Sequence, residues 1–230
     1  LRAGSPLVDL RVLGRRPVLA ANGAALIIGF AMYGAFTLVP QYVQTPADGG
    51  YGFGAGVTAS GLYLLPMAIT MLFGGPAAGR LGARYGFRAV LVSACGLGVL
   101  GFLTFVLAHR HGWGIAVGAG ILGIGIGFAF SSMANVLVAV VEPHETAEAT
   151  GVNTIVRTIG GALGAQTAAA IVTAETTGNG LPAESGYTAA FAVSALAMAV
   201  AAALARTLPR DRPPSVGAAE PDPAGRGGAA

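Results

Sequence analysis

Six long apolar runs separated by short polar stretches dominate the hydrophobic pattern of the chain. Each run has about 20 or more residues with almost no charge, which is the length an α-helix needs to cross a bilayer. The pattern therefore predicts a membrane domain over residues 18–208. Its six spanning helices are expected at about residues 18–44, 57–79, 89–108, 113–141, 149–174 and 187–208.

Composition agrees with a polytopic membrane protein and excludes two other classes. Charged residues make up 10% and hydrophobic residues 54% of the 230 residues, and the mean hydropathy is +0.69. Soluble domains contain about 25% charged residues, and disordered chains combine low hydrophobicity with high charge. We therefore expect an all-α polytopic protein whose surroundings are the lipid bilayer.

The two ends of the chain differ from the apolar runs. Residues 1–17 mix leucine and valine with arginines and are expected to form a cytoplasmic lead-in, either an interfacial segment or a simple linker. They do not have the pattern of a signal peptide. Residues 209–230 are rich in proline and glycine and are expected to form a disordered cytoplasmic tail.

The placement of arginine predicts the orientation of the spans. All 13 basic residues are arginines, and eleven of them lie on the side of the membrane that holds both termini. By the positive-inside rule, we expect both termini in the cytoplasm and the protein in the plasma (inner) membrane. This clustering explains the net charge of +3 without a nucleic-acid partner. The eleven are Arg2, Arg11, Arg15, Arg16, Arg80, Arg84, Arg88, Arg206, Arg210, Arg212 and Arg226.

The connection between the second and third spans reads GRLGARYGFR over residues 79–88. It resembles the cytoplasmic signature G-x-L-A-D-R-x-G-R-K of the major facilitator superfamily, in which this loop acts as a conformational latch. Ala83 stands where the signature has an acid, which argues against the charge-relay part of that role. The alternative is that the arginines only anchor the cytoplasmic side. The matching residues are Gly79, Leu81, Arg84, Gly86 and Arg88.

Other segments resemble the same family in the same order. They are SPLVDLRVLGRRP, LVPQYVQ and GIGIGFAFSSMANVLVAVVEPHETAEATGVNTIVRTIGGALG. Over about residues 5–208 the chain resembles the C-terminal six-helix half of the fourteen-span drug:proton antiporter branch. The resemblance implies two inverted three-helix repeats. It also implies a partner, the N-terminal six-helix half with two linking helices, and efflux of small amphipathic substrates by alternating access.

Polar and aromatic residues in the first span are candidate substrate contacts, because polar groups are costly in hydrocarbon. Tyr33 shares a helix face with Asn22 and Gln44, each 11 residues away, and Phe36 lies near that face. We predict that Tyr33 and Phe36 line the cavity between the two halves. Asn22 and Gln44 are instead expected at the two membrane interfaces.

The fourth span carries a ladder of small and polar residues at intervals of four. Gly123 and Gly127 allow close helix packing, and Ser131 and Asn135 continue the same face. The two polar residues either hydrogen-bond across the helix contact or touch the substrate. We include both among the candidate cavity residues.

Arg157 in the fifth span is the one charge expected inside the membrane. A central arginine costs about 2.5–3.5 kcal/mol on insertion scales, so it is expected to face protein or water. With Asn153 one turn earlier, it would contact an anionic substrate group or a carboxylate of the other half; alternatively, it snorkels to the interface. Gly160 and Gly164 are predicted to pack against another helix.

The acids and histidines all lie in loops, tails or span ends. Proton coupling needs Asp, Glu or His within the membrane, so we expect the coupling group in the N-terminal half. No catalytic residue, metal site or cofactor is expected, because no span pairs a nucleophile with a base or clusters metal ligands, which disfavours a membrane enzyme. A remaining alternative is a self-contained six-span channel or homodimeric half-transporter, active without a partner.

Overall fold

Six long helices form the protein in a computed structural model that describes residues 14–47, 50–177 and 180–209. All six are long and apolar enough to cross a membrane, which confirms the predicted all-α fold. Most of the predicted lead-in and tail, with Arg2, Arg11, Arg210, Arg212 and Arg226, lies outside the described residues. The helices are α2 (Arg16–Gln44), α3 (Val57–Tyr85), α4 (Phe87–Ala108), α5 (Gly112–Val140), α6 (Thr146–Thr173) and α7 (Glu184–Thr207), with a short 3-10 helix η2 (Pro143–Glu145) before α6.

The connection between α3 and α4 is shorter than the sequence pattern suggests. α3 continues to Tyr85 and α4 begins at Phe87, so the expected ten-residue loop is almost entirely helical. Gly86 makes the turn alone, with φ +87° and ψ 143°, a conformation that is essentially restricted to glycine. Its N–H donates to the carbonyl of Gly82 over 2.8 Å. The arginines at the end of α3 therefore lie within a continuous helix and do not interrupt it.

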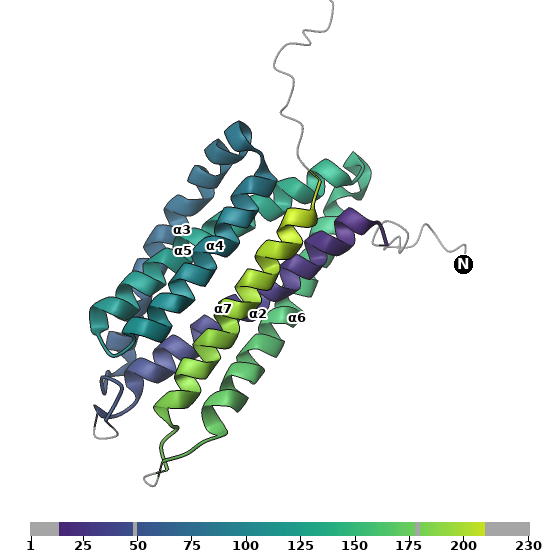
Figure 1. Ribbon diagram of the computed structural model, residues 1–230. Coiled ribbons are helices and arrows are strands. Elements are labelled where there is room, and N and C mark those ends of the chain that lie inside the picture. The colour runs from purple at the N-terminus through teal and green to yellow at the C-terminus, as the bar shows by residue number, and fades with distance from the viewer. Residues whose placement is uncertain (1–13, 48–49, 178–179, 210–230) are drawn as a thin grey trace, which may run out of the picture.

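The helix contacts repeat within the bundle. The most extensive pairs are α3 with α5 and α2 with α6, followed by α4 with α5, α4 with α7 and α2 with α7. The first repeat is α2, α3 and α4, and the second is α5, α6 and α7. When each helix is replaced by its counterpart in the other repeat, the α2–α6 pair becomes α5–α3 and the α4–α5 pair becomes α7–α2. The α4–α7 pair stays the same. Because each repeat has three helices, the second runs through the membrane in the opposite direction, as in inverted repeats. Figure 1 shows α3, α4 and α5 on one side and α2, α6 and α7 on the other.

Glycines of α6 allow it to approach α2 closely. A Cβ on Gly160 would overlap the carbonyl of Leu26, and a Cβ on Gly164 would overlap the carbonyl of Phe30. Both glycines are buried in the contact between the helices. Backbone therefore packs against backbone along this crossing, which is how membrane helices associate where lipid gives no hydrophobic drive.

The contact between α5 and α3 uses the same device. A Cβ on Gly123 would overlap the carbonyl of Met67, and a Cβ on Gly127 would lie 2.9 Å from the Cα of Gly74. Thr70 of α3 adds a hydrogen bond between the helices, because its hydroxyl lies 2.8 Å from the carbonyl of Gly120. The α2–α6 and α3–α5 crossings, both lined by glycines, therefore occupy equivalent positions in the two repeats.

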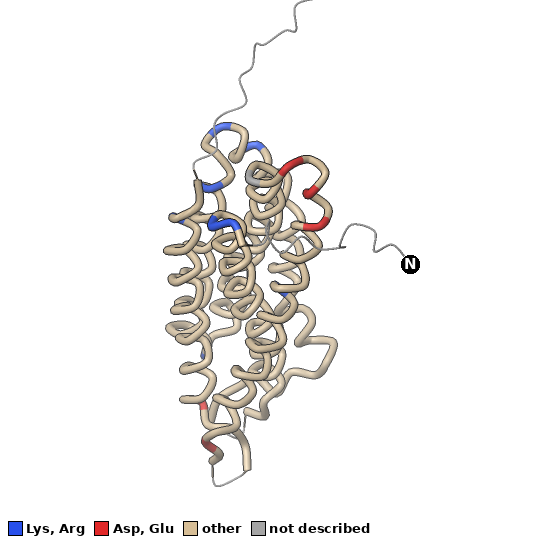
Figure 2. The backbone as a smooth tube through the Cα atoms, turned by 90° about the vertical axis from the view of Figure 1, so that its right-hand side faces the viewer, with Lys and Arg blue, Asp and Glu red and all other residues tan. Residues whose placement is uncertain are grey.

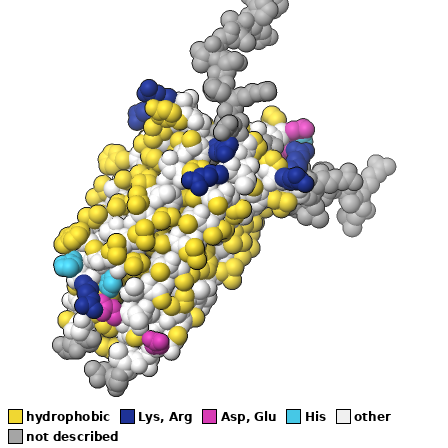
Figure 3. Space-filling view, viewed as in Figure 1, with side chains coloured by type: hydrophobic (Ala, Val, Ile, Leu, Met, Phe, Trp, Pro, Cys, Tyr) yellow, Lys and Arg dark blue, Asp and Glu magenta, His cyan; other side chains and the backbone are white. Residues whose placement is uncertain are grey.

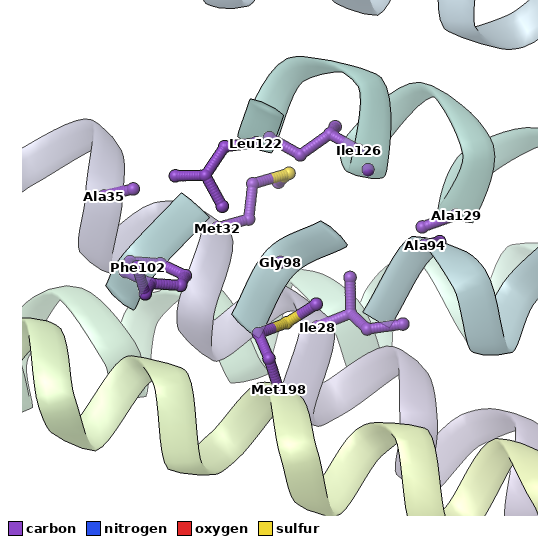
Figure 4. Close-up of a pocket in the computed structure, with 11 residues that line it drawn as sticks. Ile28, Met32, Ala35, Ala94, Gly98, Phe102, Leu122, Ile126, Ala129 and Met198 are labelled. Carbon is purple, nitrogen blue, oxygen red and sulfur yellow. The ribbon is translucent and has the colours of Figure 1, made fainter. Parts of the chain in front are cut away.

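The centre of the bundle, where α2, α4, α5 and α7 meet, is apolar and nearly closed. Figure 4 shows Met32, Phe102, Leu122 and Met198 converging from these four helices around a cavity. The cavity measures about 20 Å³. Sites for drug-sized ligands occupy about 300–1,000 Å³, so this interior space is too small for such a molecule.

Apart from Arg157 in α6, charged residues gather at the two ends of the bundle, and a largely apolar band separates them (Figures 2 and 3). One end, called here the arginine-rich end, also carries the acids around η2. The opposite end carries Arg110, Glu175 and Glu184 with two histidines. The described residues of the arginine-rich end that bear a guanidinium are Arg15, Arg16, Arg80, Arg84, Arg88 and Arg206.

Candidate substrate-binding site

α3 and α6 are the least covered helices of the bundle. Only 17% of the most apolar stretch of α3 and 28% of that of α6 is buried, against 56% for α2 and for α5. Large apolar side chains such as Leu72, Phe73, Ile155 and Leu163 are exposed on these two helices. The uncovered faces of α3 and α6 are where lipid or another part of a larger protein would pack.

Arg157 lies deep in α6 and has no acidic partner among residues 14–47, 50–177 and 180–209. It is 11 positions from Thr146, the first residue of α6, which corresponds to about 16 Å of helix. Its guanidinium carbon lies 4.4 Å from the ring centroid of Phe130 in α5, within cation–π range. The guanidinium therefore reaches sideways to α5, and this geometry disfavours snorkelling to the interface.

Asn153 lies inside the α2–α6 contact and not on the outer face. Its Nδ2 donates to Oδ1 of Asn22 over 2.9 Å, and the two residues are 3% and 9% exposed. Asn22 is therefore buried in a helix contact, whereas the sequence suggested an interfacial position. The two amides pair because both are buried away from solvent, so Asn153 is not positioned to touch a solute beside Arg157.

Tyr33 and Phe36 of α2 form an exposed aromatic pair. They are 38% and 40% exposed, and their rings meet edge to face with centroids 6.2 Å apart. The Tyr33 ring covers Gly161 of α6, while Gly29, one turn earlier in α2, packs against the carbonyl of Arg157. Tyr33 thus follows Arg157 by one turn along the same seam between α2 and α6.

Ser131 and Asn135 are separate from the glycine contact that precedes them in α5. Asn135 is exposed and donates to the carbonyl of Ser131 within its own helix over 2.7 Å. No hydrogen bond joins either side chain to another helix among the described residues. Ser131 is half-buried and follows Phe130, the residue that meets Arg157. The candidate site therefore comprises Arg157 and Phe130 with the aromatic pair Tyr33 and Phe36. Ser131 and Asn135 follow Phe130 along α5 and have no hydrogen bond to these residues within the described part of the chain.

The signature residues at the arginine-rich end lie on helix termini. Gly79, Leu81 and Arg84 occupy the last turns of α3, and the Arg84 guanidinium lies 5.3 Å from the ring centroid of Tyr85. Arg88 of α4 donates to the backbone carbonyl of Arg206 in the last turn of α7, where helix carbonyls carry partial negative charge. This contact ties the third helices of the two repeats together.

An ion pair at the same end joins the start of α2 to η2. Nη1 of Arg15 lies 3.2 Å from Oε2 of Glu145. The same carboxylate oxygen accepts from the backbone N–H of Glu142 over 3.1 Å. The pair connects the first helix of the first repeat to the linker that opens α6.

A cluster at the opposite end was not predicted from the sequence. His109 and Arg110, which follow α4, both bind Glu184, the first residue of α7, at distances of 2.6–2.9 Å. The sequence signal is weak, because each residue belongs to a loop or helix end and the partners lie 74 and 75 positions apart. Only the packing of α4 against α7 brings them together.

Known proteins with related sequences are membrane transporters. A sequence profile described as the Major Facilitator Superfamily matches residues 2–165. "Multidrug resistance protein B homolog" from Mycobacterium tuberculosis (strain ATCC 25618 / H37Rv) is 24% identical across 71% of this chain and 30% of its own length. "Multidrug resistance protein Stp" from the same strain is 26% identical across 71% of this chain and 29% of its own length. The chain thus spans less than a third of these relatives.

A solved structure has the same arrangement of helices. The xylose transporter XylE from E. coli, in an inward open conformation, matches 84% of this chain and 47% of its own, with a TM-score of 0.66 and 18% identity. At that identity the likeness concerns the fold, and it covers about half of the solved protein. The profile match covers most of this chain, so the chain belongs to the Major Facilitator Superfamily.

Proposed function

We propose that this chain is the C-terminal half of a secondary active transporter that exports small amphipathic compounds by alternating access. Two relatives named as multidrug resistance proteins support the substrate class, and both are more than three times as long as the part they share with this chain. The closed apolar centre supports the half-transporter reading, because a solute would need a second half to complete its cavity.

The position of Arg157 is the observation that carries this proposal. An arginine deep in a membrane helix, without a carboxylate among the described residues, needs either an anionic ligand or an acid from another chain segment. Phe130 offers the guanidinium an aromatic face, and Tyr33 extends the apolar surface beside it. A charged group bordered by aromatic rings suits an amphipathic compound better than a simple ion.

The N-terminal six-helix half is the partner we propose for the uncovered faces of α3 and α6. Their exposed leucine, isoleucine and phenylalanine side chains suit contact with apolar helices as well as with lipid. We further propose that this half supplies the carboxylate that couples transport to protons. Within α2 to α7, acids lie near the helix ends and not at the depth of Arg157.

We propose that the protein is a multi-pass protein of the plasma membrane with both termini in the cytoplasm. The arginine-rich end then faces the cytoplasm, in agreement with the positive-inside rule. In this orientation Gly79, Leu81, Arg84, Gly86 and Arg88 form the cytoplasmic latch. The contact of Arg88 with the last turn of α7 supports a role in holding that side closed.

Efflux measurements with variants of α6 test the proposal. In cells that express the intact transporter, we expect Arg157→Ala to slow efflux of an amphipathic dye about tenfold or more, the effect of losing one charged contact. Arg157→Lys should restore part of the rate. Ser93→Ala is the control, because Ser93 is exposed on α4, which forms neither uncovered face, and its hydroxyl donates to the carbonyl of Ala89 in its own helix. Normal efflux by Arg157→Ala at normal membrane levels would exclude this site.

Expression of the chain with and without the N-terminal half tests the division into halves. We expect dye efflux only when both halves are present, whether joined or co-expressed. Efflux by this chain alone, together with a symmetric oligomer in detergent, would instead identify a self-contained six-span transporter or channel. Under this proposal, the DNA directly upstream is expected to continue in frame into the N-terminal half, whereas a start codon there would favour the self-contained protein.

A further inference from the structure

A buried histidine meets a carboxylate at the end of the bundle opposite the arginine-rich end. Nε2 of His109 lies 2.9 Å from Oε1 of Glu184, and Nδ1 lies 2.7 Å from the backbone carbonyl oxygen of Phe105. The His109 side chain is 9% exposed, so most of the ring is shielded from solvent. Both ring nitrogens therefore face oxygen atoms, one of a carbonyl and one of a carboxyl group.

A neutral imidazole and a carboxylate together have one proton too few for both contacts to be hydrogen bonds. A neutral imidazole has one N–H, so only one ring nitrogen can donate while the other presents a lone pair. In either neutral tautomer, that lone pair would face a lone pair of Phe105 or Glu184 oxygen. One additional proton, held between His109 and Glu184, makes both contacts favourable.

The surroundings favour the imidazole as the holder of that proton. His109 follows the C-terminus of α4, where a positive charge is stabilised, and Glu184 begins α7, where a negative charge is stabilised. Arg110 donates to both carboxylate oxygens of Glu184, from Nε over 2.8 Å and from Nη2 over 2.6 Å. The carboxylate therefore binds two cationic groups, and it raises the pKa of Arg110 through a side-chain hydrogen bond.

The other titratable groups beside His109 are phenols. Tyr42 of α2 meets the imidazole edge to face, with ring centroids 5.3 Å apart. Tyr187 of α7 and Tyr51 of the α2–α3 connection pack against Tyr42 in turn. Phenols ionise near pH 10, and burial raises the pKa of Tyr51 further. These rings thus stay neutral over the range in which a histidine gains or loses a proton.

We propose that His109 and Glu184 form a proton-binding site that fastens α4 to α7. A hollow of about 480 Å³ reaches the pair from the surface and is lined by His109, Arg110 and Glu184, so the proton exchanges with solvent at this end. On release, the proton passes from Nε2 to water, and Nδ1–H keeps its bond to Phe105. The bare Nε2 then faces Oε1 of Glu184, and the tie between the two helices weakens. This inference goes beyond the proposed efflux activity and does not depend on it.

Titration of the histidine rings tests the proton site. In the intact protein in detergent, labelled with ¹⁵N-histidine, the His109 signal is the one missing from His109→Gln. We expect two ring N–H groups at low pH and loss of the Nε2 proton as the pH rises. Glu184→Gln should move that loss to lower pH, because the carboxylate no longer stabilises the imidazolium.

Further variants keep the titration test decisive if Glu184→Gln does not fold. Arg110 is largely exposed, so Arg110→Gln should fold, and removing this nearby positive charge should move the loss of the proton to higher pH. His111→Gln is the matched control and should leave the His109 signal unchanged, because His111 is exposed. A single ring N–H at every pH, or the same titration in the protein and in Arg110→Gln, would overturn the proposal.

A chemical label tests the fastening of α4 to α7. Ala190 of α7 is buried, so the thiol of Ala190→Cys is reached only when α7 moves away from its neighbours, and Cys95→Ala in the same protein removes the other thiol. We measure the rate at which a methanethiosulfonate reagent labels this thiol, and we divide it by the rate in the same protein with His109→Gln. The ratio cancels the pH dependence of the reagent. We expect this ratio to rise roughly tenfold from pH 5 to pH 9, as one charge-assisted hydrogen bond is lost. A ratio that stays constant would show that the proton does not hold the helices.

Discussion

Asn153 of α6 and Asn22 of α2 join their side-chain amides over 2.9 Å inside the bundle. The bond lies on the crossing where Gly160 and Gly164 allow α6 to approach α2. Both amides are buried, so their hydrogen bond fixes how the two helices align along their length. The same seam carries Arg157, whose position relative to α2 depends on that alignment.

Removing one amide of this pair is expected to destabilise the protein. Asn153→Ala should lower the free energy of unfolding by about 1–2 kcal/mol, because it leaves the Asn22 amide buried without a partner. Titration with SDS in mixed micelles measures this change. The double variant with Asn22→Ala should lose less than the sum of the two single variants, since no unpaired amide remains. Strict additivity would contradict the pairing.

A methyl group on Gly160 is expected to separate α6 from α2. Gly160→Ala should cost about 1–3 kcal/mol of unfolding free energy, because its Cβ would overlap the carbonyl of Leu26. Gly151→Ala is the matched control in the same helix, since Gly151 is exposed and has no neighbouring atom within 4 Å of an added Cβ. It should be neutral or stabilise the helix by up to about 1 kcal/mol. The same SDS titration compares the two, and equal effects would refute the close contact.

The turn between α3 and α4 is expected to tolerate no side chain. Gly86→Ala should cost about 1–3 kcal/mol, because the φ of +87° at this position strains any residue with a Cβ. Thermal unfolding followed by circular dichroism measures the loss. Gly79→Ala serves as the control, because Gly79 lies in α3 with no atom within 4 Å of an added Cβ, and it should keep full stability. If both variants unfolded at the temperature of the unmodified protein, the single-residue turn would be wrong.

The all-α fold was predictable because the signal for a spanning helix is local. An apolar run of sufficient length must hydrogen-bond its own backbone in lipid, and a helix does this without any knowledge of its neighbours. The end of α3 was less predictable. Arg80 and Arg84 suggested a loop, but a helix may continue past the membrane, and only Gly86 has a backbone conformation that ends it.

The partners of individual residues were not accessible from the sequence. Asn22 has the spacing of an interfacial residue in the first span, and only the packing of α6 against α2 supplies Asn153 as its partner. His109 and Glu184 likewise belong to different repeats. Such pairs depend on which helices are adjacent and on their relative heights, and the hydrophobic pattern of one helix contains neither.

The nearly closed centre of the bundle has a consequence for how the protein can change. Residues such as Met32, Phe102 and Met198 line a space of about 20 Å³, so variation there is expected to alter stability and to leave the proposed solute-contacting seam intact. Variation at Tyr33, Phe36 and Arg157 has the opposite effect, because these side chains are at least partly exposed and add little to the core. Under the proposed function, fold and selectivity therefore depend on separate sets of positions, and new substrate preferences can evolve on this bundle without rebuilding its interior.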